Sequence, residues 1–257
     1  MTNSDVVFTA LFGGYESLNE LMIEKKPDTK YICFTDDPNL KSQSWEIRVI
    51  EPTRLDSPAR SSRTIKMLGH RFFPDGTRSL YIDNTVRLKV DGALVLDSWL
   101  KSSQVAFMSH YSRKSVRGEF FICSAYGLDE QKKLWTQFQT YKHAFPDVLN
   151  QKPYWGGMIA RVNSPQTDHF MAVWDEQFRL HSKRDQLSIN VSSLISGVSI
   201  NRVSAQNDES EWHIWPIASM RNLSGRDTTS LTKFRKIKII QNGLRFGLRF
   251  YLSKFFN

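Results

Sequence analysis

The residue types in this sequence that are best suited to chemistry are a carboxylate at the end of an apolar run and a set of cations on a nearby predicted helix. Residues 80–82 are apolar and stop at Asp83, which is typical of a buried strand that carries a carboxylate to the edge of a sheet. Arg63, Lys66 and His70 share one face of the helix predicted just before it, and such a face can bind phosphate. A simple turn at Asp83 and a solvated basic face are the alternative interpretations.

Further polar residues stand at the ends of later segments. His110, Arg113 and Glu119 come directly after a predicted strand, 104–108, and their concentration of polar groups favours a ligand-binding loop, without any metal-binding spacing. Asp185 lies in the first turn of a helix predicted to begin at 183, where the helix dipole alone would favour a carboxylate.

The elements that must position these residues alternate along the chain, as in a parallel α/β sheet. The predicted strands span 5–12, 30–35, 45–50, 80–82, 104–108 and 158–162, and the predicted helices span 16–24, 63–73, 91–100 and 134–145, with two more that begin at 165 and 183. Ser62 is expected to cap the second helix, and Ser164 with Pro165 to begin the fifth. Residues 1–218 are therefore predicted to form one domain, followed by a linker and tail over 219–257.

The tail carries most of the positive charge. The 257-residue chain is 40% hydrophobic, enough for one large core, and its formal net charge is +9. Residues 231–257 contain seven basic residues and no acidic one, interleaved with apolar residues. We expect an amphipathic segment that binds an anionic membrane surface, rather than nucleic acid. A helix docked on the protein's own body is the alternative, and Gly243 and Gly247 weaken a single unbroken helix.

The same sequence also bears on location. No stretch approaches the roughly 20 apolar residues of a membrane span, and the first residues do not have the pattern of a signal peptide. A cytoplasmic location at the membrane periphery is therefore expected. Cys33 and Cys123 lie in apolar runs, which predicts buried free thiols rather than a disulfide or a metal pair.

Taken together, the motifs resemble the glycosyltransferase-like domain family that includes plant turgor-defect and mucilage-related proteins and bacterial polysaccharide-locus proteins. The shared series consists of Phe12-Gly13-Gly14-Tyr15, Cys33-Phe34-Thr35-Asp36-Asp37, Arg63-Thr64-Ile65-Lys66 with His70-Arg71, Tyr81-Ile82-Asp83, His110 with Arg113 and Glu119, Trp174, and Arg184-Asp185-Gln186-Leu187-Ser188. The resemblance covers roughly residues 5 to 195. It implies a GT-A fold, in which a Rossmann-like sheet binds a nucleotide sugar, with a UDP-sugar favoured, at its carboxyl edge.

The resemblance also implies donor-binding residues. Thr9 and Asp36 would contact the nucleotide, and Arg63 and Lys66 the diphosphate. Asp83 takes the place of the Asp-x-Asp motif, whose carboxylates usually hold Mn²⁺ or Mg²⁺ against the two phosphates.

This sequence departs from that motif. It has Asp83-Asn84-Thr85 and lacks the second acid, which puts the need for a metal in question. His213 is a candidate second ligand, although a lone histidine between aromatic residues is more often packed than metal-bound.

A later motif implies the catalytic residues. Asp185-Gln186 followed by Asn190 is similar to the Asp-Gln-x-x-x-Asn run of glycosyltransferase family eight, where these side chains face the donor sugar. If Asp185 reaches the acceptor hydroxyl it would act as a general base and invert the anomeric centre. If Gln186 lies under the donor ring, the configuration of the anomeric centre would be retained, and the similarity to family eight favours retention. His110, Arg113 and Glu119 would line the acceptor side.

The sequence thus predicts a glycosyltransferase that extends a glycan or a lipid-linked acceptor in surface polysaccharide synthesis. Two other classes stay open. One is a non-catalytic protein that binds membranes or nucleic acid through its basic tail. The other is a lipid hydrolase of ceramidase type, which would need a nucleophile elbow or a histidine-rich zinc motif, and neither motif is visible in the sequence.

Overall fold

The computed structural model describes residues 5–54, 57–215 and 233–252, and the side chains of residues 239–249 in the last of these segments. The whole predicted linker, 219–230, and residues 231–232 and 253–257 of the predicted tail lie outside this range.

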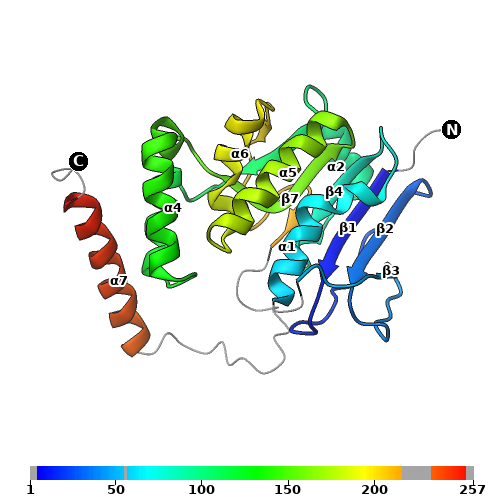
Figure 1. The fold of residues 1–257 in the computed structure, drawn as a ribbon. Helices are drawn as coiled ribbons and strands as arrows, with labels where there is room; N and C mark the ends of the chain where they lie inside the picture. The colour runs from blue at the N-terminus through cyan, green and yellow to red at the C-terminus, as the bar shows by residue number, and fades with distance from the viewer. Residues whose placement is uncertain (1–4, 55–56, 216–232, 253–257) are drawn as a thin grey trace.

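A seven-stranded mixed sheet forms the centre of the molecule, in the order β3-β2-β1-β4-β7-β6-β8 (Figure 1). Its strands are β1 (Asp5–Leu11), β2 (Thr29–Thr35), β3 (Glu46–Val49), β4 (Arg78–Ile82), β6 (Val105–Ser109), β7 (Tyr154–Val162) and β8 (Asn201–Val203). The first four are mutually parallel, β8 is parallel to β6, and β7 runs antiparallel to both of its neighbours. The predicted α/β class with a mixed, mostly parallel sheet is confirmed.

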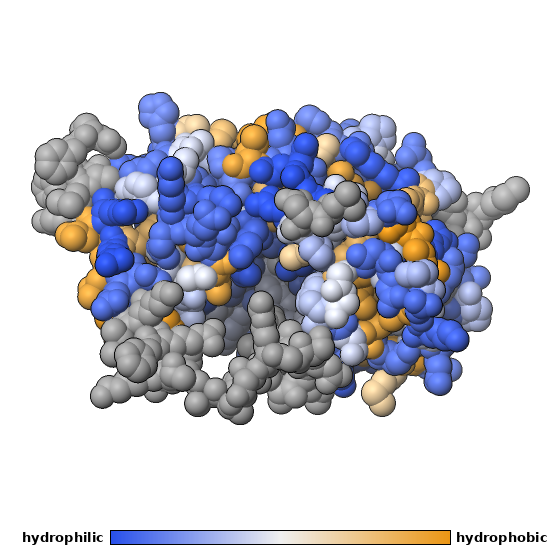
Figure 2. Space-filling view, turned by 60° about the horizontal axis from the view of Figure 1, so that its bottom comes forward, coloured by the Kyte–Doolittle hydropathy of each residue, from blue (hydrophilic) through white to orange (hydrophobic). Residues whose placement is uncertain are grey.

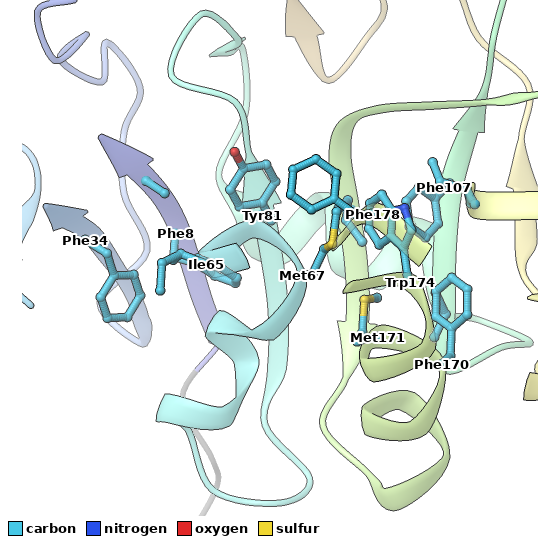
Figure 3. Close-up of a cluster of buried hydrophobic side chains, with 14 of the residues drawn as sticks. Phe8, Phe34, Ile65, Met67, Tyr81, Phe107, Phe170, Met171, Trp174 and Phe178 are labelled. Carbon is cyan, nitrogen blue, oxygen red and sulfur yellow. The ribbon is translucent and has the colours of Figure 1, made fainter. Parts of the chain in front are cut away.

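Helices cover both faces of this sheet because the buried strands present apolar side chains on each side. Helices α1 (Pro58–Leu68) and α5 (Pro165–Leu180) enclose an aromatic-rich core on one face, where Phe8, Tyr81 and Trp174 are buried (Figure 3). Helix α2 (Gly92–Trp99) packs on the other face. A two-stranded sheet, β5 (Arg87–Leu88) with β9 (His213–Ile214), follows the end of β4.

A third hydrophobic cluster lies beside the sheet and is helical. It contains α3 (Val116–Ala125), α4 (Gln131–Ala144), α6 (Ile189–Ser196) and α7 (Lys233–Leu252), with the 3₁₀ turns η2 (Pro146–Asn150) and η3 (Asp185–Leu187). Phe246 of α7 is buried against Trp135 and Phe138 of α4, with ring centroids 5.4 and 5.6 Å away. The described part of the basic tail therefore docks on the body (Figure 1). Among the described residues, no helix combines the length and the apolar character needed to span a bilayer.

Two local predictions are wrong. Residues 16–24 are irregular rather than helical because distant side chains satisfy their backbone groups. The backbone N–H of Asn19 donates to Asn84 Oδ1 at 2.9 Å, and that of Leu21 donates to Ser44 Oγ at 2.9 Å. Helix α1 starts at Pro58 after Ser57, earlier than the expected cap at Ser62, because proline fits the first turn of a helix.

Other boundaries agree with the sequence only in part. The predicted start of α5 is confirmed, since the Ser164 hydroxyl accepts a hydrogen bond from the backbone N–H of Thr167. Helix α1 continues into a 3₁₀ turn, η1 (Gly69–Phe72), which completes the predicted helical segment. The predicted loop of residues 110–119 ends early, because Ser115 caps α3 by accepting from the N–H of Gly118.

Candidate functional site

A polar cleft of about 330 Å³ lies at the carboxyl end of β4. It is bounded by α1, the turn after β4, the loop before α3, the first residues of β7 and the η3 turn. Its lining includes Arg63, Lys66, Asp83, His110, Ser112, Arg113, Glu119, Ile122, Leu128, Trp155, Gly156, Gly157, Arg184, Asp185, Gln186 and Trp215. Figure 2 looks onto the lower side of Figure 1, where blue, hydrophilic residues predominate above a central recess.

Asp83 is fixed at the end of β4 by backbone and side-chain bonds. Its N–H donates to the carbonyl of Gly157 on β7 at 2.9 Å, and the N–H of Val86 donates back to its carbonyl at 2.8 Å. The Tyr81 hydroxyl donates to Asp83 Oδ1 at 2.9 Å. Asp83 is thus both a turn residue and a cleft residue, so the two interpretations of the sequence are compatible.

Lys66 lies between the two carboxylates of the cleft. Its Nζ is 2.7 Å from Asp185 Oδ2 and 3.5 Å from Asp83 Oδ1, and the side chain is only 2% exposed. Room for this ammonium depends on Gly156, where an added Cβ would lie 3.0 Å from Lys66 Nζ. A buried cation bridging two acids is the central feature of the cleft.

The backbone of Asp185 is hydrogen-bonded to a tryptophan of the hydrophobic core. The Trp174 indole N–H donates to its carbonyl oxygen at 2.9 Å, which anchors the η3 turn against α5. Burial would raise the pKa of the Asp185 carboxyl, but the charges of Lys66 and of Arg63, whose Nε is 3.5 Å away, outweigh burial and lower that pKa. Burial alone would lower the pKa of the Arg63 guanidinium. The charges of Asp185 and Asp83 outweigh burial and raise that pKa. Asp185 is therefore ionised at neutral pH.

The opposite wall of the cleft is organised by Glu119, which is buried at the start of α3. Its carboxylate accepts from Arg113 Nε at 2.8 Å and from Gln186 Nε2 at 2.6 Å. Gln186 is thus oriented toward Glu119. His110 lines the same wall, and within the described chain its buried Nδ1 has no hydrogen-bond partner. Burial lowers the pKa of His110 to about 4, with Glu119 opposing and Arg113 reinforcing that shift, so the ring is neutral at physiological pH.

Several predicted site residues do not line this cleft. Thr9 lies inside β1, two residues before its end, and is fully buried. Asp36 follows β2, but its carboxylate accepts from the N–H of Gly13 at 2.9 and 3.1 Å and so holds the glycine turn beside α1. His70 points away from Lys66 and lies 3.1 Å from Asp168 of α5.

Both ring nitrogens of His213 lie within hydrogen-bond distance of other residues of the chain. Its Nδ1 is 2.7 Å from the Ser210 hydroxyl, its Nε2 is 3.0 Å from the Asn207 carbonyl, and its ring stacks on Trp155. Both ring nitrogens are therefore occupied, which corrects the expectation of a free ligand at this position.

The residues of the cleft do not fit a protein-held divalent cation. Mn²⁺ and Mg²⁺ favour several oxygen ligands, and the position between Asp83 and Asp185 is taken by the Lys66 ammonium. In the described part of the chain, no group of three or more His, Cys, Asp and Glu side chains is arranged to hold a metal.

The sequence did not identify the β7 contribution to the site. Trp155, Gly156 and Gly157 line the cleft, and their role depends on β7 entering the sheet antiparallel beside β4. The paired glycines before a strand were the available signal, since glycine in a strand marks a close approach of another group. Trp215 also lines the cleft, and nothing in its local sequence indicates it, whereas Arg184 opens the motif that already pointed to Asp185 and Gln186.

Comparisons with known proteins connect this chain to a glycosyltransferase-like domain family. The family model described as "TOD1/MUCI70, glycosyltransferase-like domain" matches residues 2–202. A protein of Arabidopsis thaliana described as "Probable hexosyltransferase MUCI70" is 27% identical over 164 residues, which is 60% of this chain and 28% of the relative's length. The chain thus corresponds to under a third of that relative.

Solved structures show weaker similarity. A bifunctional glycosyltransferase, WbbM, in its apo form, aligns with a TM-score of 0.41 at 12% identity over 79% of this chain and 39% of its own. Apo mouse xyloside xylosyltransferase 1 aligns with a TM-score of 0.41 at 8% identity over 77% of this chain and 84% of its own. Both similarities are too low to bear on function.

Proposed function

We propose that this chain, which belongs to the TOD1/MUCI70 glycosyltransferase-like domain family, transfers a sugar from a nucleotide sugar, with a UDP-sugar as the favoured donor, to a glycan or a lipid-linked acceptor in surface polysaccharide synthesis. The observation that carries the proposal is the buried Lys66 ammonium between Asp83 and Asp185, with Arg63 beside it. These groups supply both signs of charge within one cleft, and the transfer reaction needs both signs.

The cations suit the leaving group. As the bond between the anomeric carbon and the nucleoside diphosphate breaks, negative charge develops on the phosphate oxygens. Lys66 and the 30% exposed Arg63 side chain line the cleft and can stabilise this negative charge. Such interactions are stronger in the low dielectric of a partly buried site than in water. The protein's own cations thus supply the stabilising charge in this proposal.

The carboxylate of Asp185 suits the sugar. Positive charge develops on the anomeric carbon as the leaving group departs, and an ionised carboxylate nearby stabilises it electrostatically. The ion pairs that lower the pKa of Asp185 also make it a weak base, which disfavours base-assisted inversion. We therefore favour retention of configuration, with Asp185 facing the donor ring.

His110 suits the acceptor. A neutral imidazole with an unpartnered nitrogen can accept a hydrogen bond from the acceptor hydroxyl and orient it. Arg113 adds a cation on the same wall, which favours an acidic or phosphorylated acceptor. Glu119 holds both Arg113 and Gln186 and so acts as a positioning residue.

We also propose a cytoplasmic location at the periphery of the membrane. Arg245 and Arg249 are exposed on α7. Exposed cations suit the anionic cytoplasmic leaflet, which attracts each basic residue by about 1 kcal/mol.

The experiment is donor turnover with matched carboxylate variants. Purified chain is incubated with UDP-, GDP- and CMP-sugars, and release of the nucleotide is followed with and without candidate acceptors. Asp83→Asn and Asp185→Asn are each expected to reduce turnover by about a hundredfold or more. Asp97→Asn serves as the control, because that exposed carboxylate pairs with Arg78 and does not line the cleft. Full turnover in both cleft variants would refute the proposal, and product NMR distinguishes retention from inversion.

A further inference from the structure

An apolar groove runs between α3 and α7. Its volume is about 670 Å³, and its walls carry Phe121, Ile122 and Tyr126 on one side and Ile240, Leu244 and Leu248 on the other. Phe121, Tyr126 and the three α7 residues are themselves exposed, and the α7 residues are 60 to 68% exposed. Apolar exposure this concentrated on a surface marks a binding site.

The groove is built by the way α7 docks. Phe246 anchors the helix on α4, and Gly243 faces α3, since an added Cβ there would lie in ordinary contact, 3.4 Å from Phe121 Cζ. The residues Ile240, Leu244 and Leu248 are four apart, so they form one stripe that faces away from the anchor. Phe246 therefore fixes α7 on α4, while the stripe of Ile240, Leu244 and Leu248 lines the groove.

The groove and the polar cleft lie on either side of one shared lining residue. Ile122 lines both, and Glu119, one turn earlier on α3, belongs to the acceptor wall of the cleft. Helix α3 thus presents a polar end to one site and an apolar end to the other.

Charge beside the groove favours an amphiphile with an anionic head. Arg245 and Arg249 follow the stripe on α7 and are exposed, and no acidic residue occurs in 231–257. Arg113 and Arg184 line the adjoining cleft. An apolar groove with cations at its polar end matches a phosphorylated lipid better than a protein helix or a second copy of this chain.

We infer that the groove between α3 and α7 holds the hydrocarbon chain of a lipid-linked, phosphorylated acceptor whose head group reaches the cleft past Ile122. This inference deepens the proposed function and rests on it. It assigns the acceptor to the lipid-linked class and gives α7 a direct part in acceptor binding.

The test measures chain-length dependence of binding to the full chain. Dodecyl phosphate and ethyl phosphate are titrated calorimetrically, below the micelle concentration of the longer probe. Wild type is expected to bind dodecyl phosphate far more tightly. The Leu244→Gln/Leu248→Gln double variant is expected to weaken that binding by about tenfold or more, because two apolar contacts are lost. Leu180→Gln, at an exposed leucine on α5, is the matched control and should bind like wild type.

Each other outcome overturns the inference. The groove holds no chain if the double variant binds dodecyl phosphate as wild type does, or if chain length has no effect. The stripe is a membrane-docking surface instead if only flotation with phosphatidylcholine/phosphatidylglycerol vesicles depends on Leu244 and Leu248. It is a self-association surface if the double variant converts a dimer to a monomer by analytical ultracentrifugation. Nucleotide-sugar turnover, measured without acceptor in the same variants, tests the proposed function separately, since neither leucine touches the donor site.

Discussion

Replacing Lys66 by methionine removes the cation between two acids while keeping a long unbranched side chain in place. Lys66 and Asp185 have side-chain exposures of 2% and 9%, and their charged atoms are 2.7 Å apart. Removing one partner of a buried ion pair leaves the other charge without compensation and costs about 3–5 kcal/mol. Asp83, at 26% exposed and 3.5 Å away, is hydrated enough to add little. We expect Lys66→Met to lower the free energy of unfolding by about 3–5 kcal/mol at pH 7.

The loss should depend on pH in a definite direction. In the wild type the pKa of Asp185 lies below its ordinary value, so its ionised form contributes stability above the unfolded pKa of about 4, and this stability is lost as the pH falls through the folded pKa. In Lys66→Met, burial is no longer outweighed by the ammonium, so the pKa of Asp185 rises. Protonation then relieves the buried carboxylate, whose remaining ionic partner is Arg63 at 3.5 Å, as the pH falls from 7, and the difference between variant and wild type shrinks.

Urea unfolding followed by tryptophan fluorescence at pH 7 and pH 4.5 measures both effects. Lys133→Met is the control, because Lys133 pairs with Glu130 at 2.7 Å on the exposed side of α4 and should change stability by less than about 1 kcal/mol. Adding Asp185→Asn to Lys66→Met should restore more than half of the loss. A loss below about 1 kcal/mol at pH 7, or an equal loss at both pH values, would refute the bridging role of Lys66.

Three further results are expected. Gly156→Ala should reduce transfer about tenfold with little change in melting temperature. The added Cβ would lie 3.0 Å from Lys66 Nζ and displace the ammonium. Gly118→Ala on α3 is the control for both the transfer assay and the melting temperature. The wild-type transfer rate should show no titration of His110 between pH 5 and 8, and it should fall as the ring becomes protonated near pH 4. Comparing the pH–rate profiles of the wild type and His110→Asn checks this. The thermal shift produced by UDP should survive EDTA and be lost in Lys66→Met, because the ammonium takes the position between the carboxylates; a shift abolished by EDTA would contradict this.

Sequence periodicity indicated part of the cleft lining and left other interpretations open. Arg63 and Lys66, three residues apart on a helix, and Asp83 at the end of an apolar run were predicted to face a common site, and the structure places them in one cleft. Asp185 joins them from over a hundred residues later, and local sequence could not exclude that it only caps a helix. The resemblance to a known family supplied that connection.

Long-range contacts explain what the sequence left hidden. Residues 16–24 have the spacing of a helix, yet Asn84 and Ser44 bind their backbone from other segments. The contribution of Gly156 depends on β7 running antiparallel beside β4, a register that no local signal encodes. The apolar stripe of α7 became distinguishable from its anchor only when Phe246 was placed against α4.

The charge arrangement of the cleft is hard to explain by stability alone. Buried ion pairs can often be exchanged for apolar residues with no loss, or with a gain of about 1–4 kcal/mol. The cleft nevertheless carries four cations, Arg63, Lys66, Arg113 and Arg184, against three carboxylates, Asp83, Glu119 and Asp185. With His110 neutral, the protein's own side chains leave the cleft with an excess of positive charge. A diphosphate entering this cleft would find cations already desolvated and oriented, so little reorganisation would be needed when charge develops on the leaving group. The stability forgone in burying Lys66 is thus best explained as preorganisation for an anionic donor.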